Sequence, residues 1–153
     1  MTEDRGKSTD EGRPRTAPVT LTVPSQPKYL YVVRNALYPL VLDAGFPKKE
    51  ARKIVLGVDE ACSNIIRHAY SGDPSKTITM TVEDGAERFV VRLRDYGRKV
   101  ARAEIVPRDL KDIRPGGLGT HFINLVFESV SYETDQGQGT LLTLEKKKQR
   151  VKT

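Results

Sequence analysis

The sequence has a single cysteine and no long apolar run, and both features restrict what the protein can be. Because Cys62 is the only cysteine among 153 residues, no disulfide can form within the chain, which is typical of a reducing compartment. No apolar stretch approaches the ~20 residues that a transmembrane helix needs. Residues 1–18 are charged and lack the apolar segment of a secretion signal. We therefore expect a cytoplasmic protein without a membrane partner.

The net charge of +6 is concentrated near the C-terminus and does not indicate a nucleic-acid-binding surface. Residues 146–153 contain five basic side chains and no acidic one, whereas acids and bases balance within residues 1–18. The region between these segments is close to neutral, which argues against direct nucleic-acid binding. We expect a disordered tail at 1–18, one domain at 19–146 and a basic tail at 147–153.

Hydrophobic periodicity divides the expected domain into about three helices and five strands. Apolar residues at helical spacing predict helices that start near Ser25, Pro47 and Gly119, and alternating residues predict strands at 19–23, 77–82, 89–93, 130–134 and 140–144. Ser25 is placed to cap the first helix, and Pro39 should kink it. The pattern predicts an α/β fold, a two-layer sandwich of helices on a mixed, largely antiparallel five-stranded sheet.

The second predicted helix carries polar side chains in a line beside its apolar face. Glu60, Asn64 and His68 recur every four residues, so they stack along one side of the helix. A carboxylate and a carboxamide one turn apart offer oxygen ligands of the kind that Mg²⁺ prefers. A carboxylate beside such a metal can also orient or deprotonate a hydroxyl. Taken alone, this line could equally be the solvated face of an amphipathic helix.

Three further motifs follow along the chain. Asp95 and Gly97 stand at the exit of a predicted strand, and a glycine cluster at 116–119 runs directly into the last predicted helix. A turn then precedes the strand that begins at Thr140. Bare backbone N–H groups at a helix start can hold phosphate, although glycines also serve turns and caps. The order of the four motifs is more specific than any one of them.

This order resembles the ATP-binding domain shared by DNA gyrase, sensor histidine kinases and mismatch-repair ATPases. Within that superfamily the chain is most similar to the small bacterial anti-sigma-factor serine/threonine kinases. The segments that carry this likeness are 23–29, 33–34, 59–64 and 68–70. The resemblance extends over roughly the whole expected domain and implies the histidine-kinase-like ATPase fold.

The resemblance also implies a role for each motif. Glu60 would be the catalytic base, Asn64 would be the Mg²⁺ ligand, and Asp95 would accept a hydrogen bond from the exocyclic amine of adenine. The remaining residues expected to bind the ATP cofactor, beside the base or around the phosphates, are Gly97, Gly117, Gly119, Thr120 and Thr140.

By resemblance, the protein would be an ATP- and Mg²⁺-dependent protein serine/threonine kinase that also sequesters a sigma factor. Its substrate would be a hydroxyl on an anti-sigma-factor antagonist, and phosphorylation would break their complex in a partner switch. The family also suggests a homodimer. Arg34, on the first predicted helix, matches an arginine of the family and could either contact a partner or be solvated surface.

One departure from the family keeps an alternative open. Lys99 stands where the fullest form of the aspartate motif has a second glycine. The segment 98–115, expected to be the nucleotide lid, also looks short. A non-catalytic nucleotide- or partner-binding regulatory module is therefore the alternative to the kinase. We expect no helix with an acceptor histidine before residue 19, which disfavours the ATPase half of a sensor histidine kinase.

Overall fold

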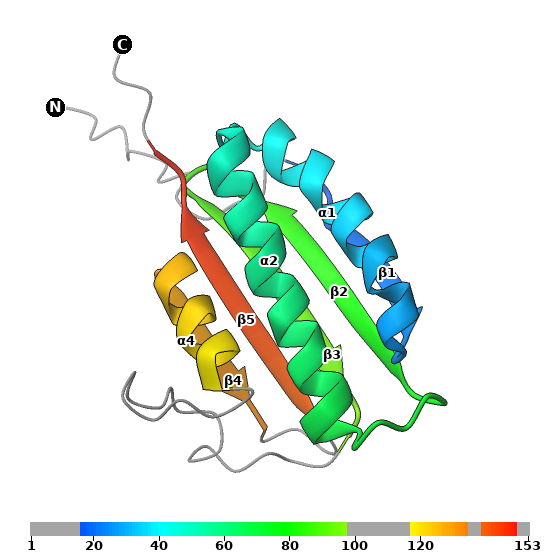
Figure 1. Cartoon of the computed structure of the whole chain (residues 1–153). Helices are drawn as coiled ribbons and strands as arrows, with labels where there is room; N and C mark the ends of the chain where they lie inside the picture. The colour runs from blue at the N-terminus through cyan, green and yellow to red at the C-terminus, as the bar shows by residue number, and fades with distance from the viewer. Residues whose placement is uncertain (1–15, 98–116, 135–138, 150–153) are drawn as a thin grey trace, which may run out of the picture.

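Three helices cover one face of a five-stranded sheet (Figure 1) in the computed structural model, which describes residues 16–97, 117–134 and 139–149. The spatial order of the strands is β1-β2-β3-β5-β4, and all four pairings are antiparallel. The predicted two-layer α/β sandwich is confirmed. The strands are β1 (Val19–Pro24), β2 (Thr77–Asp84), β3 (Arg88–Asp95), β4 (Ser129–Glu133) and β5 (Thr140–Lys147).

The helical layer consists of α1 (Leu30–Asp43), α2 (Lys48–Asn64) and α4 (Gly117–Val126). Figure 1 shows α2 lying across the middle of the sheet, with α1 on one side and α4 on the other. A short 3₁₀ turn, η1 (Pro27–Tyr29), precedes α1, and a π-helical turn, η2 (Ile65–Ala69), continues α2. The predicted second helix is therefore present, but its last turn is wider than an α-helical turn.

The apolar side of α2 and the centre of the sheet form one core. The residues of α2 that are no more than 1% exposed recur at helical spacing, and alternate residues of β3 are equally buried. Burial of these two faces against each other provides the main driving force for the fold. The residues concerned are Ala51, Ile54, Val58, Ala61 and Cys62 on α2 and Phe89, Val91 and Leu93 on β3.

The start of the first helix differs from the sequence prediction. Ser25 is 1% exposed, and its hydroxyl donates to the backbone oxygen of Asp73 at 2.7 Å instead of capping a helix. This bond ties the end of β1 to the loop that follows η2. Pro39 lies inside α1, and the kink expected there stays a prediction. The predicted cap was wrong because the partner of Ser25 lies far away in the sequence.

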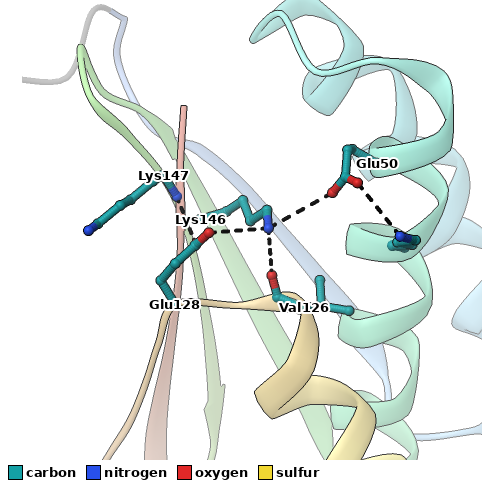
Figure 2. Close-up of polar contacts among 6 residues, drawn as sticks. Glu50, Val126, Glu128, Lys146 and Lys147 are labelled. Carbon is teal, nitrogen blue, oxygen red and sulfur yellow. Dashed lines mark hydrogen bonds and ion pairs between the residues drawn. The ribbon is translucent and has the colours of Figure 1, made fainter. Parts of the chain in front are cut away.

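Lys146 joins the ends of two helices to the sheet. Figure 2 shows its ammonium group directed at Val126 O (2.8 Å), at Glu128 Oε1 (3.3 Å) and at Glu50 Oε2 (3.9 Å). Val126 is the last residue of α4, where a cation is favoured by the exposed carbonyl groups of the helix end. Glu50 lies in the first turn of α2. Lys146 therefore holds the start of α2 and the end of α4 against β5.

Among the described residues, none of the helices combines the length and apolar character needed to span a lipid bilayer.

Two neighbouring apolar residues of α2 test this packing. Ile54 is fully buried, whereas Leu56 is 48% exposed. We expect Ile54→Ala to lower the free energy of unfolding by about 2–5 kcal/mol, because it leaves a cavity in the core. Leu56→Ala should change it by no more than about 0.5 kcal/mol, as is usual at the surface. Urea denaturation of both variants measures the difference, and equal losses would contradict the observed orientation of α2.

Candidate functional site

A buried carboxylate lies at the end of β3. Asp95 is the last residue of the strand and is 3% exposed. Its Oδ1 accepts a hydrogen bond from the Gly97 N–H at 3.0 Å. Burial raises the pKa of Asp95 above its usual range, although the N–H groups of Gly97 and Thr140 and the charge of Arg94 act in the opposite direction. A titratable group that burial perturbs beside specific polar partners is typical of a functional site.

Thr140 adds an unsatisfied hydroxyl to the same place. The β3–β5 register sets Asp95 directly opposite Thr140, which is 6% exposed. The Oγ1 of Thr140 is buried and finds no hydrogen-bond partner among the described residues. A buried polar group left unpaired costs about 1–3 kcal/mol. A ligand or water that bonded this hydroxyl would remove that cost.

Two glycines allow the backbone to close tightly around Asp95. A Cβ atom at Gly97 would lie 2.3 Å from the backbone oxygen of Ala69, at the end of η2. A Cβ atom at Gly139 would lie 2.1 Å from the backbone oxygen of Asp95, and Gly139 also has a φ of +97°. The turn after β3 therefore packs directly on η2. The close approach of this turn to η2 requires glycine at position 97. A contact of Gly97 with a nucleotide stays a prediction.

The start of α4 lies against Glu60. A Cβ atom at Gly119 would come 2.4 Å from a carboxylate oxygen of Glu60. A larger residue at this position would require the carboxylate end of Glu60 to move. The glycine therefore brings the first turn of α4, with its bare N–H groups, close to the polar line of α2. Glu60 and Gly119, predicted separately from the sequence, are brought together.

Asn64 ends α2 one turn after Glu60, and its side chain is engaged. The Nη2 of Arg67 donates to the Oδ1 of Asn64 at 2.9 Å. This is the oxygen that the sequence assigned to Mg²⁺. Arg67 follows Asn64 by three residues, a spacing that brings helical side chains into contact, and this spacing is the signal that the sequence reading did not use. The contact lies where α2 passes into the π turn η2, a type of turn that is frequent at functional sites.

The predicted residues therefore form two groups that η2 connects. One group contains Glu60, Asn64 and Gly119, and the other contains Asp95, Gly97 and Thr140. Gly117 and Thr120 lie in the first turns of α4, where the Thr120 backbone oxygen accepts a hydrogen bond from Asn124 at 2.9 Å. Lys99, Gly116 and the expected lid at 98–115 lie outside the described residues.

Arg34 is also engaged by a neighbouring helix. Its guanidinium forms an ion pair with Asp59 of α2 at 2.7 Å, and its side chain remains 45% exposed. Asp59 directly precedes Glu60 in α2, so this ion pair borders the polar line. The sequence allows Arg34 to be either a partner contact or solvated surface, and the structure adds a link between α1 and α2.

Within the described residues, no cluster of three or more His, Cys, Asp or Glu side chains could hold a metal ion. In the part of the chain that the structure describes, Asn64 therefore has no cluster of this kind beside it.

Comparison with known proteins places the chain in a family. The model of the histidine kinase-like ATPase domain matches residues 23–146. The chain therefore belongs to the histidine kinase-like ATPase domain family, as the order of the four motifs predicted.

Among individual proteins, the chain is similar to two serine-protein kinases. The serine-protein kinase RsbW of Listeria innocua is 28% identical over 133 residues, which cover 82% of this chain and 85% of that protein. The serine-protein kinase RsbW of Halalkalibacterium halodurans is 27% identical over 127 residues, covering 78% of this chain and 77% of that protein. The relatives' names agree with the serine/threonine kinase predicted from the sequence.

Two solved structures confirm the fold. One contains the RsbU and RsbW domains of a Mycobacterium tuberculosis protein, with a TM-score of 0.56 and 16% identity, covering 85% of this chain and 31% of that one. The other is the histidine kinase domain of a blue-light activated kinase from Erythrobacter litoralis, with a TM-score of 0.51 and 19% identity. It covers 80% of this chain and 60% of that one.

The substitution Asp95→Asn tests whether the buried charge of Asp95 destabilises the folded protein. Because burial raises the pKa of Asp95, the ionised carboxylate destabilises the folded state at neutral pH, and this penalty disappears as the pH falls through that pKa. Asparagine is neutral and can still accept the Gly97 N–H. We therefore expect Asp95→Asn to raise the free energy of unfolding at neutral pH.

Urea denaturation over a pH series measures this effect. The advantage of the variant should shrink toward acid pH as the wild-type carboxyl group becomes protonated. A variant less stable than the wild type at neutral pH would show instead that the charge serves the fold.

Proposed function

We propose that the protein is an ATP- and Mg²⁺-dependent serine/threonine kinase of the cytoplasm that acts as an anti-sigma factor. The observation that supports this most strongly is the buried Asp95 carboxylate facing the unpaired Thr140 hydroxyl. The RsbW serine-protein kinases among its relatives support the same class of activity.

The pocket at the end of β3 has the polar groups that an adenine base requires. The Asp95 carboxylate offers acceptor capacity beyond the bonds from Gly97 and Thr140. The exocyclic amine of adenine would supply a donor to it, and the Thr140 hydroxyl would bond a water molecule or a ring nitrogen. A site built to accept from that amine discriminates against bases that lack it, because its buried acceptor would then be unpaired.

The phosphate side would lie between the end of α2 and the start of α4. The C-terminal end of a helix attracts cations and the N-terminal end attracts anions. The contact between Glu60 and Gly119 shows that the last turns of α2 lie close to the start of α4. Asn64 would bind Mg²⁺ there, and Gly117, Gly119 and Thr120 would contact the phosphates. ATP supplies the phosphoryl group, and Mg²⁺ neutralises its charge during transfer.

Glu60 would act on the acceptor hydroxyl. It lies one helical turn before Asn64 on the same side of α2, and so on the phosphate side of the site. Its carboxylate would accept the hydrogen bond of an incoming serine hydroxyl. It would take the proton as the serine oxygen bonds the γ-phosphorus and the bond from that phosphorus to the leaving ADP breaks. The line of polar residues thereby orients the nucleophile toward the group that is transferred.

The partners belong to the same proposal. A sigma factor and an anti-sigma-factor antagonist are implied by the resemblance of the chain to this kinase family, as is a homodimer. No direct role for nucleic acid is included. Arg34 would belong to the partner surface, where its exposed guanidinium is already positioned by Asp59.

One contact favours a second candidate, a regulatory module that holds nucleotide or a partner without transferring phosphate. The Asn64 oxygen expected to bind Mg²⁺ accepts a hydrogen bond from Arg67. If this contact persists with nucleotide bound, it occupies one of the two lone pairs of that oxygen and places a cation beside it, which would weaken Mg²⁺ binding and phosphotransfer. Phosphotransfer assays distinguish the two candidates.

Calorimetry with ADP and Mg²⁺ tests the base pocket. We expect Asp95→Asn to weaken ADP binding by about 1.5–3 kcal/mol, the usual scale for a hydrogen bond to a charged group. Asp43→Asn makes the same chemical change at an exposed residue that ends α1, so it should leave binding unchanged. Equal affinity in the Asp95 variant would move the base elsewhere, and a wild-type protein that ignores ADP at millimolar concentration would contradict the proposal.

Glu60→Gln tests the assigned chemistry. The variant keeps the shape of the side chain, so it should bind ADP as the wild type does. Phosphotransfer from ATP to the antagonist should fall by roughly 10²–10⁴-fold, the range for a positioned general base. Glu133→Gln, on the edge strand β4, serves as the matched control. Unchanged transfer in the Glu60 variant would remove this residue from the mechanism, and a wild type without any transfer would favour the regulatory module.

A further inference from the structure

A tyrosine outside the predicted site holds the turn that carries Asp95. Tyr70 directly follows η2 and is 5% exposed. Its hydroxyl donates to the backbone oxygen of Thr77 at 2.5 Å and accepts the N–H of Tyr96 at 2.8 Å. One side-chain oxygen therefore connects the start of β2 to the residue that follows β3.

The hydroxyl stands where a direct bond between the two strands would be expected. The β2–β3 register pairs Thr79 with Arg94, so its continuation by two residues would set Thr77 opposite Tyr96. In a regular antiparallel ladder, opposite residues of a hydrogen-bonded pair bond each other directly. Here the Tyr70 hydroxyl lies between the two backbone groups and satisfies both. It acts as a spacer where the β2–β3 ladder, whose last pair is Thr79 and Arg94, has ended.

This spacing decides where the turn after β3 lies. The Tyr96 amide belongs to the peptide bond that follows Asp95, and Gly97 comes next. A Cβ atom at Gly97 would lie 2.9 Å from Cδ1 of the Tyr70 ring. The same glycine donates its N–H to the Asp95 carboxylate. The tyrosine thus contacts the turn on both sides of the peptide that orients this carboxylate.

We propose that Tyr70 is a positioning residue that sets the base selectivity of the site, because its hydroxyl holds the Asp95–Gly97 turn in the orientation that reads adenine. This inference rests on the proposed binding of adenine by Asp95. Burial raises the pKa of Tyr70. The hydrogen bond from the Tyr96 N–H acts in the opposite direction, and the nearby charge of Asp95 raises the pKa further. The phenol therefore stays protonated at neutral pH and can donate to Thr77 while it accepts from Tyr96.

Tyr70→Phe removes the bridging oxygen and keeps the ring. Without it, the Thr77 carbonyl and the Tyr96 N–H either remain unpaired or bond directly, and the second outcome would draw the turn toward β2. We expect the affinity for Mg²⁺–ADP to fall roughly tenfold or more, as loss of such a bond implies. The affinity for inosine diphosphate, which lacks the exocyclic amine, should change little. The ratio of the two affinities should therefore fall toward one.

A control variant separates positioning from general stability. Tyr132→Phe removes the hydroxyl of a partly buried tyrosine on β4, and it should keep the wild-type ratio. If Tyr70→Phe weakens both diphosphates equally, or keeps the wild-type ratio, Tyr70 does not set selectivity. If the wild-type protein itself binds ADP and inosine diphosphate equally, the proposed role of Asp95 fails, and this inference fails with it.

Amide hydrogen exchange provides a measurement that does not depend on the variant being well folded. In the wild-type protein, the Tyr96 N–H should exchange slowly, because it is bonded to a buried hydroxyl. Exchange of this amide at the rate of an open loop would overturn the bridge. In Tyr70→Phe its exchange should become faster than that of the amides within β3.

Discussion

The burial of one carboxylate constrains the whole site-bearing end of this protein. A charge taken out of water costs several kcal/mol unless other groups bond it, and Asp95 is almost completely buried. Gly97 and Thr140 provide the backbone N–H groups that compensate. These donors can approach only because the turns on either side of them contain glycine, at Gly97 and Gly139. Three separate segments, β3, β5 and η2, therefore meet around the turn formed by Asp95 and Gly97.

The second constraint is the length of α2, which connects the two ends of the molecule. At one end Lys146 holds the first turn of α2 and the last residue of α4. At the other end the contact between Glu60 and Gly119 sets α2 against the first turn of α4. The two helices are therefore antiparallel. The C-terminal end of α2, which attracts cations, lies beside the N-terminal end of α4, which attracts anions. That arrangement suits a magnesium-bound phosphate, and it depends on packing far from the site as much as on residues within it.

The sequence predicted the elements well because periodicity is a local property. Alternation located β2 and β3, and the apolar stripe located α2, although not the π turn η2, whose residues fit the same helical pattern. The position of Asp95 beside Thr140 could not be derived from spacing, since β3 and β5 are separated by a long stretch of chain. Their proximity was implied only by the family resemblance. The bond from Ser25 to Asp73 and the bridge made by Tyr70 were missed for the same reason, because each depends on a partner that tertiary structure brings near.

Burial alone does not distinguish the groups of the proposed site from purely structural ones. Burial, with a contribution from Asp59, raises the pKa of Cys62 to about 12, but this thiol lies on the apolar face of α2 and behaves as a small hydrophobic side chain. Asp95 is perturbed in the same direction, yet it is surrounded by directed N–H groups and by an unpaired hydroxyl. An apolar side chain at position 95 would avoid the cost of desolvating the Asp95 carboxylate. A hydrogen-bonding partner for Thr140 would avoid the cost of its unpaired hydroxyl. That both costs persist in one place is the physical argument that this end of the sheet is built for a ligand.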